Sequence, residues 1–291
     1  MRVLNIIKET KEGFKIQVGS DGIEFLIIES SKLDACIKYV LDGNINAITI
    51  NCFQGYELTE ISFLNQLTNV LERLHIPETK FDIKGINSLH KLRFLGFSDN
   101  KKDIVDLINF PNLENLACDY SIRLKGLKYC KNLKFLSLTR YKTKRKDLSL
   151  LPLLPHLKEL SLFVTDIDCL HGIEKYGTLK RLELFSATKL ERIKDLETVS
   201  NSIEEIQIEQ SKKIQDYEII GNLHSLEKII LSNAGEIKTL SFLKTLPNLK
   251  FISFVNTNVL DGDLSFCKGI KYVGFINKRH YSHRFEQFNK S

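Results

Sequence analysis

The sequence of 291 residues predicts an α/β solenoid, in which repeats stack side by side and a parallel sheet runs along one side. Two observations predict this fold. The apolar pattern L-x-x-L-x-L recurs eleven times between Ile45 and Phe275, and successive copies start 20 to 26 residues apart. Before several copies, apolar residues recur at a spacing of three, as in Leu148, Leu151 and Leu154. Since that spacing is typical of 3₁₀ turns, each repeat is expected to be a strand, a loop and a 3₁₀ or short helical return.

The pattern resembles the leucine-rich repeat, whose period is roughly 20–29 residues, and is most similar to the bacterial internalin-like type. The resemblance covers residues 44–277 and implies a horseshoe with a parallel sheet on its concave face and 3₁₀ turns and short helices on its convex face. The asparagine usual in this repeat is present only as Asn100, and we expect hydroxyl groups to bond the turn backbone in its place. These hydroxyl groups belong to Thr79, Ser121, Thr165, Ser211 and Thr257.

The two ends of the chain lack the repeat and are expected to cap it. Residues 14–18 and 23–28 alternate like two strands around a turn at 19–22. Ser30 and Ser31 are expected to cap a helix that runs to about Leu41. We therefore predict an N-terminal cap of hairpin plus helix at 1–43, and a C-terminal tail at 278–291 that closes the last repeat with Tyr281 and Phe285.

Composition and charge exclude several classes of protein. Apolar residues make up 43% and charged residues 27%, as in ordinary globular proteins. The net charge of +6 is too small to indicate nucleic acid by itself. The run Val3–Ile7 is too short for a signal peptide, and no stretch reaches the ~20 apolar residues of a membrane span. The six scattered cysteines contain no C-x-x-C pair and are expected to be reduced thiols in a cytoplasmic protein.

The sequence contains none of the motifs that mark common catalytic sites. There is no phosphate-binding P-loop, no G-x-S-x-G and no H-E-x-x-H. His90, His156 and His224 occupy the same position of their repeats, just before a strand, which favours a role in turn packing. We therefore expect no catalytic residue, no cofactor and no metal site, and a protein that is not an enzyme.

Strand alternation places the third, fifth and seventh residues of each copy on the concave, solvent-facing side. Several are aromatic, which suggests an interaction surface, and four glutamates form an acidic zone, interrupted by Arg181, that suits a basic feature on a partner. The alternative is generic concave polarity, with aromatic rings packed on their neighbours. The predicted partner-binding residues are Phe94, Phe135, Glu159, Phe163, Arg181, Glu183, Phe185, Glu205, Glu209, Phe251 and Tyr272.

Basic residues gather in one segment. Residues 123–146 contain ten Lys or Arg and no Asp or Glu. Such a run is either a solvated loop or a contact for nucleic acid or an acidic partner, and the concave face itself is not basic. The predicted basic loop consists of Arg140, Lys142, Lys144, Arg145 and Lys146.

These observations predict a non-enzymatic, protein-binding scaffold in the bacterial cytoplasm. Internalin-like relatives are exported, whereas solitary cytoplasmic proteins of this kind resemble immunity proteins, in which the concave face occludes a toxin domain. The alternatives are an adaptor or regulator of an endogenous enzyme and, less favoured, a nucleic-acid binder that uses the basic loop. We expect a protein partner on the concave face, no membrane partner, and a monomer in the unbound state.

Overall fold

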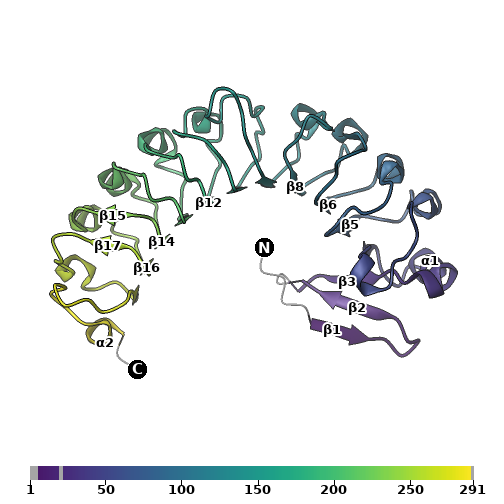
Figure 1. Ribbon diagram of the computed structural model, residues 1–291, viewed down its shortest axis with the longest axis horizontal. Coiled ribbons are helices and arrows are strands. Elements are labelled where there is room, and N and C mark those ends of the chain that lie inside the picture. Colours follow the sequence, from purple (N-terminus) through teal and green to yellow (C-terminus); the bar gives the residue numbers. More distant parts are fainter. Residues whose placement is uncertain (1–5, 20–21, 290–291) are drawn as a thin grey trace. The chain divides into compact units, whose positions relative to one another are not determined.

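The structure, a computed structural model, describes residues 6–19 and 22–289. The chain forms two compact units, unit 1 (Met1–Leu133) and unit 2 (Lys134–Ser291). In each unit, short strands form a sheet on one side of the repeats, and 3₁₀ turns lie on the other side (Figure 1). Both units therefore show the predicted leucine-rich-repeat solenoid.

The sheet of unit 1 has the strand order β1-β2-β3-β4-β5-β6-β8. The first three strands pair antiparallel, and from β3 onward the strands are parallel. Two further short strands, β7 and β9, pair outside this sheet. The strands are β1 (Ile6–Glu9), β2 (Lys15–Val18), β3 (Glu24–Ile27), β4 (Ala47–Thr49), β5 (Arg73–Ile76), β6 (Phe94–Phe97), β7 (Val105–Asp106), β8 (Asn115–Asp119) and β9 (Leu124–Lys125), and the α-helix is α1 (Leu33–Leu41). The 3₁₀ turns are Ser30–Lys32, Cys52–Gln54, Ser62–Gln66, Lys84–Ser88, Leu107–Asn109 and Leu127–Tyr129.

The sheet of unit 2 has the strand order β10-β11-β12-β13-β14-β16-β18, all parallel. A second small sheet pairs β15 with β17. The strands are β10 (Phe135–Thr139), β11 (Glu159–Phe163), β12 (Arg181–Phe185), β13 (Glu205–Glu209), β14 (Lys228–Ser232), β15 (Glu236–Ile237), β16 (Phe251–Ser253), β17 (Asn258–Val259) and β18 (Tyr272–Gly274), and the α-helix is α2 (Phe285–Phe288). The 3₁₀ turns are Ile173–Lys175, Lys194–Val199, Tyr217–Asn222, Ser241–Thr245 and Ser265–Cys267.

The repeat predicted the register of the strands correctly. In unit 2 Phe163 on β11 pairs with Phe185 on β12, and Phe185 pairs with Glu209 on β13. The leucines of the pattern point into the core, where most of them are fully buried. The apolar residues at spacing three are buried as well, except that Ile104 is 56% exposed and Val105 is buried in its place. Val105 belongs to the short strand β7, which pairs with β9.

One residue after the seventh position of most repeats, the backbone adopts a positive φ. In five repeats of unit 2 the N–H of this residue donates to the carbonyl of the next strand's seventh residue, for example from Val164 to Phe185 (2.8 Å) and from Ser186 to Glu209 (2.9 Å). This hydrogen bond recurs between repeats and turns the chain away from the sheet. The residues with positive φ at this position are Asp99, Arg140, Val164, Ser186, Gln210, Asn233 and Asn256.

The expected hydrogen bonds from hydroxyl groups to turn backbone are present, with one exception. Thr165 donates to the carbonyl of Tyr141 (2.7 Å), and Thr257 accepts from the N–H of Ala234 (3.0 Å). Asn100, Ser121 and Ser211 also bond backbone groups. Thr79 differs, because its buried hydroxyl has no hydrogen-bond partner among the described residues. The hydroxyl groups thus tie neighbouring repeats of unit 2 together.

The N-terminal end contains the expected hairpin, β2 and β3, followed by α1. The sequence did not predict β1, which extends the hairpin by a third antiparallel strand. The expected serine cap is wrong, because the Ser30 hydroxyl accepts the N–H of Glu57 (2.8 Å) and α1 begins at Leu33 without a side-chain cap. Residues 1–5 and 20–21, which include part of the predicted apolar run and turn, lie outside the described residues.

At the C-terminal end, Tyr281 is 7% exposed and its ring lies 5.9 Å from that of Phe275, while Phe285 lies 6.1 Å from Phe275. Asn289 covers the free edge of β18, because its side-chain amide accepts the N–H of Val273 (3.1 Å) and donates to the Val273 carbonyl (2.8 Å). The Asn289 side chain therefore forms the backbone hydrogen bonds that a neighbouring strand would form with β18. The predicted division into cap 1–43, repeats 44–277 and tail 278–291 stays a prediction, and residues 290–291 lie outside the described residues.

Candidate functional site

We call the side of each sheet that faces away from the core its open face. It carries the third, fifth and seventh residues of each repeat, as the strand register requires. The leucines of the pattern face the other way, into the core. The open face of unit 2 holds all of the predicted partner-binding residues except Phe94.

The third-position row of unit 2 forms a ladder of ion pairs across four strands. Arg181 binds Glu205 through two hydrogen bonds of 3.0 Å and reaches Glu159 at 3.2 Å. Lys228 lies 3.4 Å from Glu205 on the following strand. Burial works to raise the pKa of Glu205, but the hydrogen bond and charge of Arg181 outweigh it and hold that pKa below its usual value. The acidic zone expected here is thus partly neutralised by cations of the protein itself.

Aromatic rings of the open face stack in pairs at the spacing of the strands. The rings of Phe163 and Phe185 lie 4.5 Å apart and are parallel within 3°. Phe251 and Tyr272 lie 4.6 Å apart, with 15° between their planes, and the ammonium of Lys228 is 5.8 Å from the Phe251 ring. Tyr272 is 39% exposed, and the three phenylalanines are half-buried. These pairs present flat apolar surface to solvent.

Two carboxylates of this face form no ion pair with a described residue. Glu183 accepts a hydrogen bond from the hydroxyl of Ser161 (2.7 Å), and Glu209 accepts one from the amide of Gln207. Hydrogen bonding to Glu205 is the largest cause that raises the pKa of Arg181, and the charge of Glu183 acts in the same direction from farther away. This face carries four glutamates and two cations, Arg181 and Lys228, so its net charge is −2. The net charge of the whole protein, in contrast, is +6.

The open face of unit 1 differs, and the expected exposure of Phe94 is wrong. Phe94 is only 6% exposed and packs with Phe25 and Ala47. The ring of Phe25, which comes from the hairpin strand β3, lies 5.7 Å from that of Phe94 and 6.2 Å from that of His75. Phe94 is buried because the hairpin extends the sheet and supplies a second ring, Phe25, which packs with Phe94 and Ala47.

The predicted basic loop is a structured turn with exposed charges. Arg140, Lys142, Lys144, Arg145 and Lys146 are all exposed. Tyr141 anchors the loop, since it is fully buried and its hydroxyl donates to the carbonyl of Asp147 (3.1 Å). The loop leaves the sheet at the end of β10, so it lies beside the open face of unit 2 without forming part of it.

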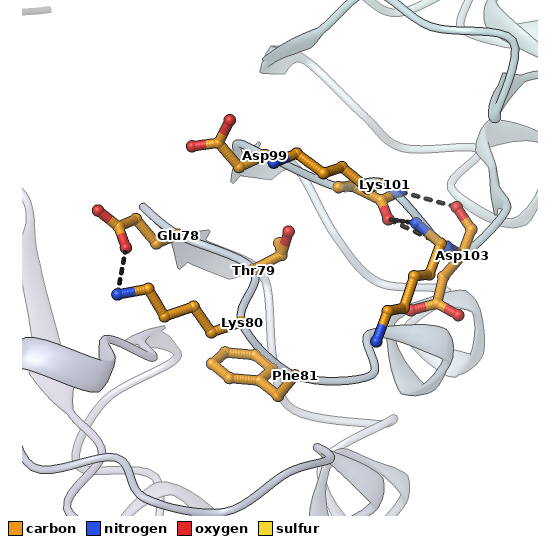
Figure 2. Close-up of a pocket in the computed structure, with 9 residues that line it drawn as sticks. Glu78, Thr79, Lys80, Phe81, Asp99, Lys101 and Asp103 are labelled. Carbon is orange, nitrogen blue, oxygen red and sulfur yellow. Dashed lines mark hydrogen bonds and ion pairs between the residues drawn. The ribbon is translucent and has the colours of Figure 1, made fainter.

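A pocket of about 280 Å³ lies in unit 1 beyond the ends of β5 and β6 (Figure 2). Three of the charged residues that line it form contacts within the protein. Lys80 pairs with Glu78 at 3.1 Å and lies over the ring of Phe53, and Asp103 accepts the N–H of Ile83 (2.9 Å). Glu78, Lys80 and Asp103 therefore already have partners within the protein.

Two histidines of the repeats and one buried cysteine have contacts or surroundings that stabilise the fold. His90 bonds the carbonyl of Asn109 (3.0 Å) and His224 that of Thr245 (3.1 Å), as expected for turn packing. Burial raises the pKa of the Cys130 thiol to about 12. Within residues 6–19 and 22–289, no group of three or more His, Cys, Asp or Glu side chains could hold a metal ion. None of the helices in that part of the chain is long and apolar enough to cross a membrane.

Sequence reasoning missed one residue of this surface. Val164 follows Phe163 at the end of β11 and is 49% exposed. Its backbone has a φ of 55°, a region that valine rarely adopts. A valine gives no signal for a positive φ, so the sequence could not have identified it.

No protein-family model matches this chain, and no curated protein matches it either. Among solved structures, it is similar to an internalin, InlF, of Listeria monocytogenes, with 16% identity and a TM-score of 0.53 over 88% of this chain and 82% of that one. The functional domain of InlJ from the same organism gives 16% and 0.40 over 80% and 64%, and a leucine-rich-repeat protein of Leptospira interrogans gives 18% and 0.42 over 80% and 79%. The strand-and-turn repeat described above and the likeness to InlF agree, and the chain has the leucine-rich-repeat fold.

Proposed function

We propose that the protein is a non-enzymatic scaffold that binds another protein through the open face of unit 2. The observation that carries this proposal is the pair of half-buried aromatic stacks, Phe163–Phe185 and Phe251–Tyr272, on one continuous sheet. Aromatic side chains contribute much of the binding energy in protein interfaces. Rings that are already stacked lose little conformational freedom when a partner binds, which favours affinity.

The dimensions of this face suit a protein partner. Seven parallel strands at roughly 4.8 Å spacing cover about 30 Å across the sheet. Side chains along such a sheet can supply the ~800 Å² that one partner contributes to a standard interface. The ladder of ion pairs around Arg181 holds the middle of the surface in one arrangement.

The finer proposal is that the partner is a toxin domain and that the protein is a cytoplasmic immunity protein of a bacterium. A rigid face that lies over a toxin's active site would block substrate without any chemistry by the scaffold. The alternative is an adaptor or regulator of an endogenous enzyme, which would use the same face. The gene neighbourhood separates the two, because an immunity protein is expected beside the gene of its toxin.

The test is to co-express the protein with the product of the adjacent gene, and to measure complex formation and rescue of growth. Wild-type protein is expected to co-purify in a fixed ratio and to restore growth. Phe163→Ala/Phe185→Ala is expected to lose both while remaining folded. Phe53→Ala, which removes a 72% exposed ring in unit 1, is the matched control and is expected to behave as wild type. Absence of both complex and rescue with wild-type protein would reject the immunity function.

A second candidate, nucleic-acid binding, has one observation in its favour, the five exposed cations at 140–146. Binding of this kind depends steeply on salt. Neutralising Lys142, Lys144 and Arg145 to Gln would then abolish binding of a duplex DNA or RNA probe at 50 mM salt. We expect wild-type protein to bind such a probe no better than this triple variant.

A further inference from the structure

The geometry points to an arginine side chain of the partner protein as the group that binds at Phe185, between the carboxylates of Glu183 and Glu209. This inference rests on the proposed function and specifies its chemistry. It starts from the two carboxylates of the open face that lack an ion pair with any described residue, although two neighbouring glutamates are paired.

The strand register places these carboxylates around one aromatic ring. Glu183 stands two residues before Phe185 on β12, on the same face, and Glu209 stands opposite Phe185 on β13. Phe163 covers one side of the Phe185 ring, since the two rings are parallel at 4.5 Å. The other side of that ring is turned toward Glu209. The Cα atoms of Glu183 and Glu209 are therefore roughly 8 Å apart across the diagonal. The Glu183 carboxylate turns toward Ser161 on β11, so it leaves that hydroxyl when it binds a group on the free side of the Phe185 ring.

Arginine fits this arrangement better than any other side chain. A guanidinium is planar, stacks on aromatic rings, and donates hydrogen bonds in several directions at once. It can therefore lie against Phe185 and bind both carboxylates. The ammonium of a lysine is a compact charge that is more strongly hydrated than a guanidinium, and it stacks less well on an aromatic ring. Arg181 shows the same chemistry one row away, where it binds Glu159 and Glu205 together.

Val164 supports contact with a partner independently of the charges. At this position the following repeats have Ser186, Gln210, Asn233 and Asn256. Asparagine tolerates a positive φ, whereas a β-branched residue is strained there. Burial does not explain the valine, because it is 49% exposed. An apolar group held at the end of β11, next to Phe163, suits an apolar residue beside the arginine of the partner.

The probe is a phage-displayed library of random dodecapeptides, panned at 50 mM salt on the full-length protein. Binders are expected to be enriched in an arginine next to an apolar residue. As synthetic peptides, they should lose at least tenfold in affinity for Glu183→Gln/Glu209→Gln, and as much when their arginine is replaced by lysine. Glu191→Gln/Glu236→Gln removes two charges from exposed sites off the open face and is expected to leave affinity within twofold.

The outcomes separate this inference from the proposed function. Peptides that require Phe163 and Phe185 but contain no arginine, or that bind Glu183→Gln/Glu209→Gln as tightly as wild type, would overturn the arginine site and leave the binding face in place. A lysine peptide of equal affinity would overturn the assignment to arginine. If no selected peptide is weakened by Phe163→Ala/Phe185→Ala, both the inference and the proposed binding face fail. Thermal unfolding of each variant, monitored by circular dichroism, confirms that it is folded.

Discussion

The aromatic rings on the open faces of the two units differ in burial. In unit 1 the aromatic ring of the third-position row, Phe94, is buried against Phe25 and closes over Ala47. In unit 2 the rings of the corresponding face stay half-buried and stack on one another, as Phe163 and Phe185 do. The open face of unit 1 is thus an extension of the hydrophobic core, and that of unit 2 is the surface on which we propose that a partner binds.

The difference shows that the position in a repeat determines the direction of a side chain but not its burial. Burial depends on the neighbouring strands. In unit 1 the non-repeat strand β3 contributes Phe25, and a small residue stands between the rings. In unit 2 the charged side chains of the third-position row pair with one another, as Arg181 does with Glu205. The stacked rings of Phe163 and Phe185, on the same face as these ion pairs, remain partly exposed.

The largest expected effect tests the contrast directly. Phe94→Ala should lower the free energy of unfolding by about 3–5 kcal/mol, because it removes a buried ring and leaves a cavity. Phe163→Ala should cost only about 1 kcal/mol, since that ring loses one stacking contact and little burial. Urea unfolding followed by circular dichroism measures both. Leu136→Ala, in the core of unit 2, is the positive control, with an expected cost of roughly 2–5 kcal/mol. If Phe94→Ala and Phe163→Ala lower the free energy of unfolding equally, the two open faces do not differ in the burial of their aromatic rings.

The next largest effect is a dependence of the free energy of unfolding on pH, which arises from His75 in unit 1. Burial lowers the pKa of His75 to about 4. The unfolded chain takes up a proton near pH 6.5, so between these values the unfolded state binds more protons and stability falls as the pH is lowered. The loss begins near pH 6.5, ends near pH 4 and amounts to about 3 kcal/mol.

The measurement for His75 is the difference between two pH profiles of the free energy of unfolding. His75→Gln removes the titrating ring but keeps a polar side chain near Thr49, whose hydroxyl lies 3.3 Å from the imidazole. Wild-type protein is expected to lose more stability than the variant between pH 6.5 and 4. Parallel profiles would mean that His75 is open to solvent, and that the face of unit 1 is not closed.

The sequence predicted the fold and the register because both depend on a local period. Phe163, Phe185 and Glu209 fall into one row by counting residues within each repeat, and the structure pairs them in that way. The burial of Phe94 could not be predicted, because the ring that covers it comes from the hairpin outside the repeat. The strand β1 was missed because Ile6 and Ile7 do not alternate with polar residues.

The candidate site was predicted as a set of residues but not as an arrangement. Four glutamates were assigned to one acidic zone, yet Glu159 and Glu205 are paired while Glu183 and Glu209 are not. That division depends on which carboxylates the guanidinium of Arg181 reaches, which spacing along the chain does not reveal. The proposal of an arginine partner could therefore arise only once the side chains had been placed.

A smaller effect concerns the ion-pair ladder of unit 2. Arg181→Met removes the cation between Glu159 and Glu205 and should lower the free energy of unfolding by roughly 1 kcal/mol, a modest value because the side chain is 38% exposed. The loss should be greater at 20 mM than at 500 mM salt, since salt screens the repulsion left between the two glutamates. Denaturation midpoints at the two salt concentrations measure it. An unchanged midpoint at low salt would show that the ladder does not hold the open face.

The smallest effect is a gain. Val164→Asn should raise the free energy of unfolding by about 1 kcal/mol, because asparagine accommodates the positive φ that strains valine, while the backbone hydrogen bond to Phe185 is kept. Asn233→Val places the same strain at the end of β14, one strand away from Glu209 of the proposed binding site. This variant is expected to lower the free energy of unfolding by a similar amount. If the valine serves a partner, Val164→Asn should also weaken the selected peptides, so that stability and binding change in opposite directions. If Val164→Asn neither raises stability nor lowers affinity, the positive φ of Val164 costs no free energy of unfolding. Binding to the open face of unit 2 would then depend on its aromatic rings and carboxylates alone.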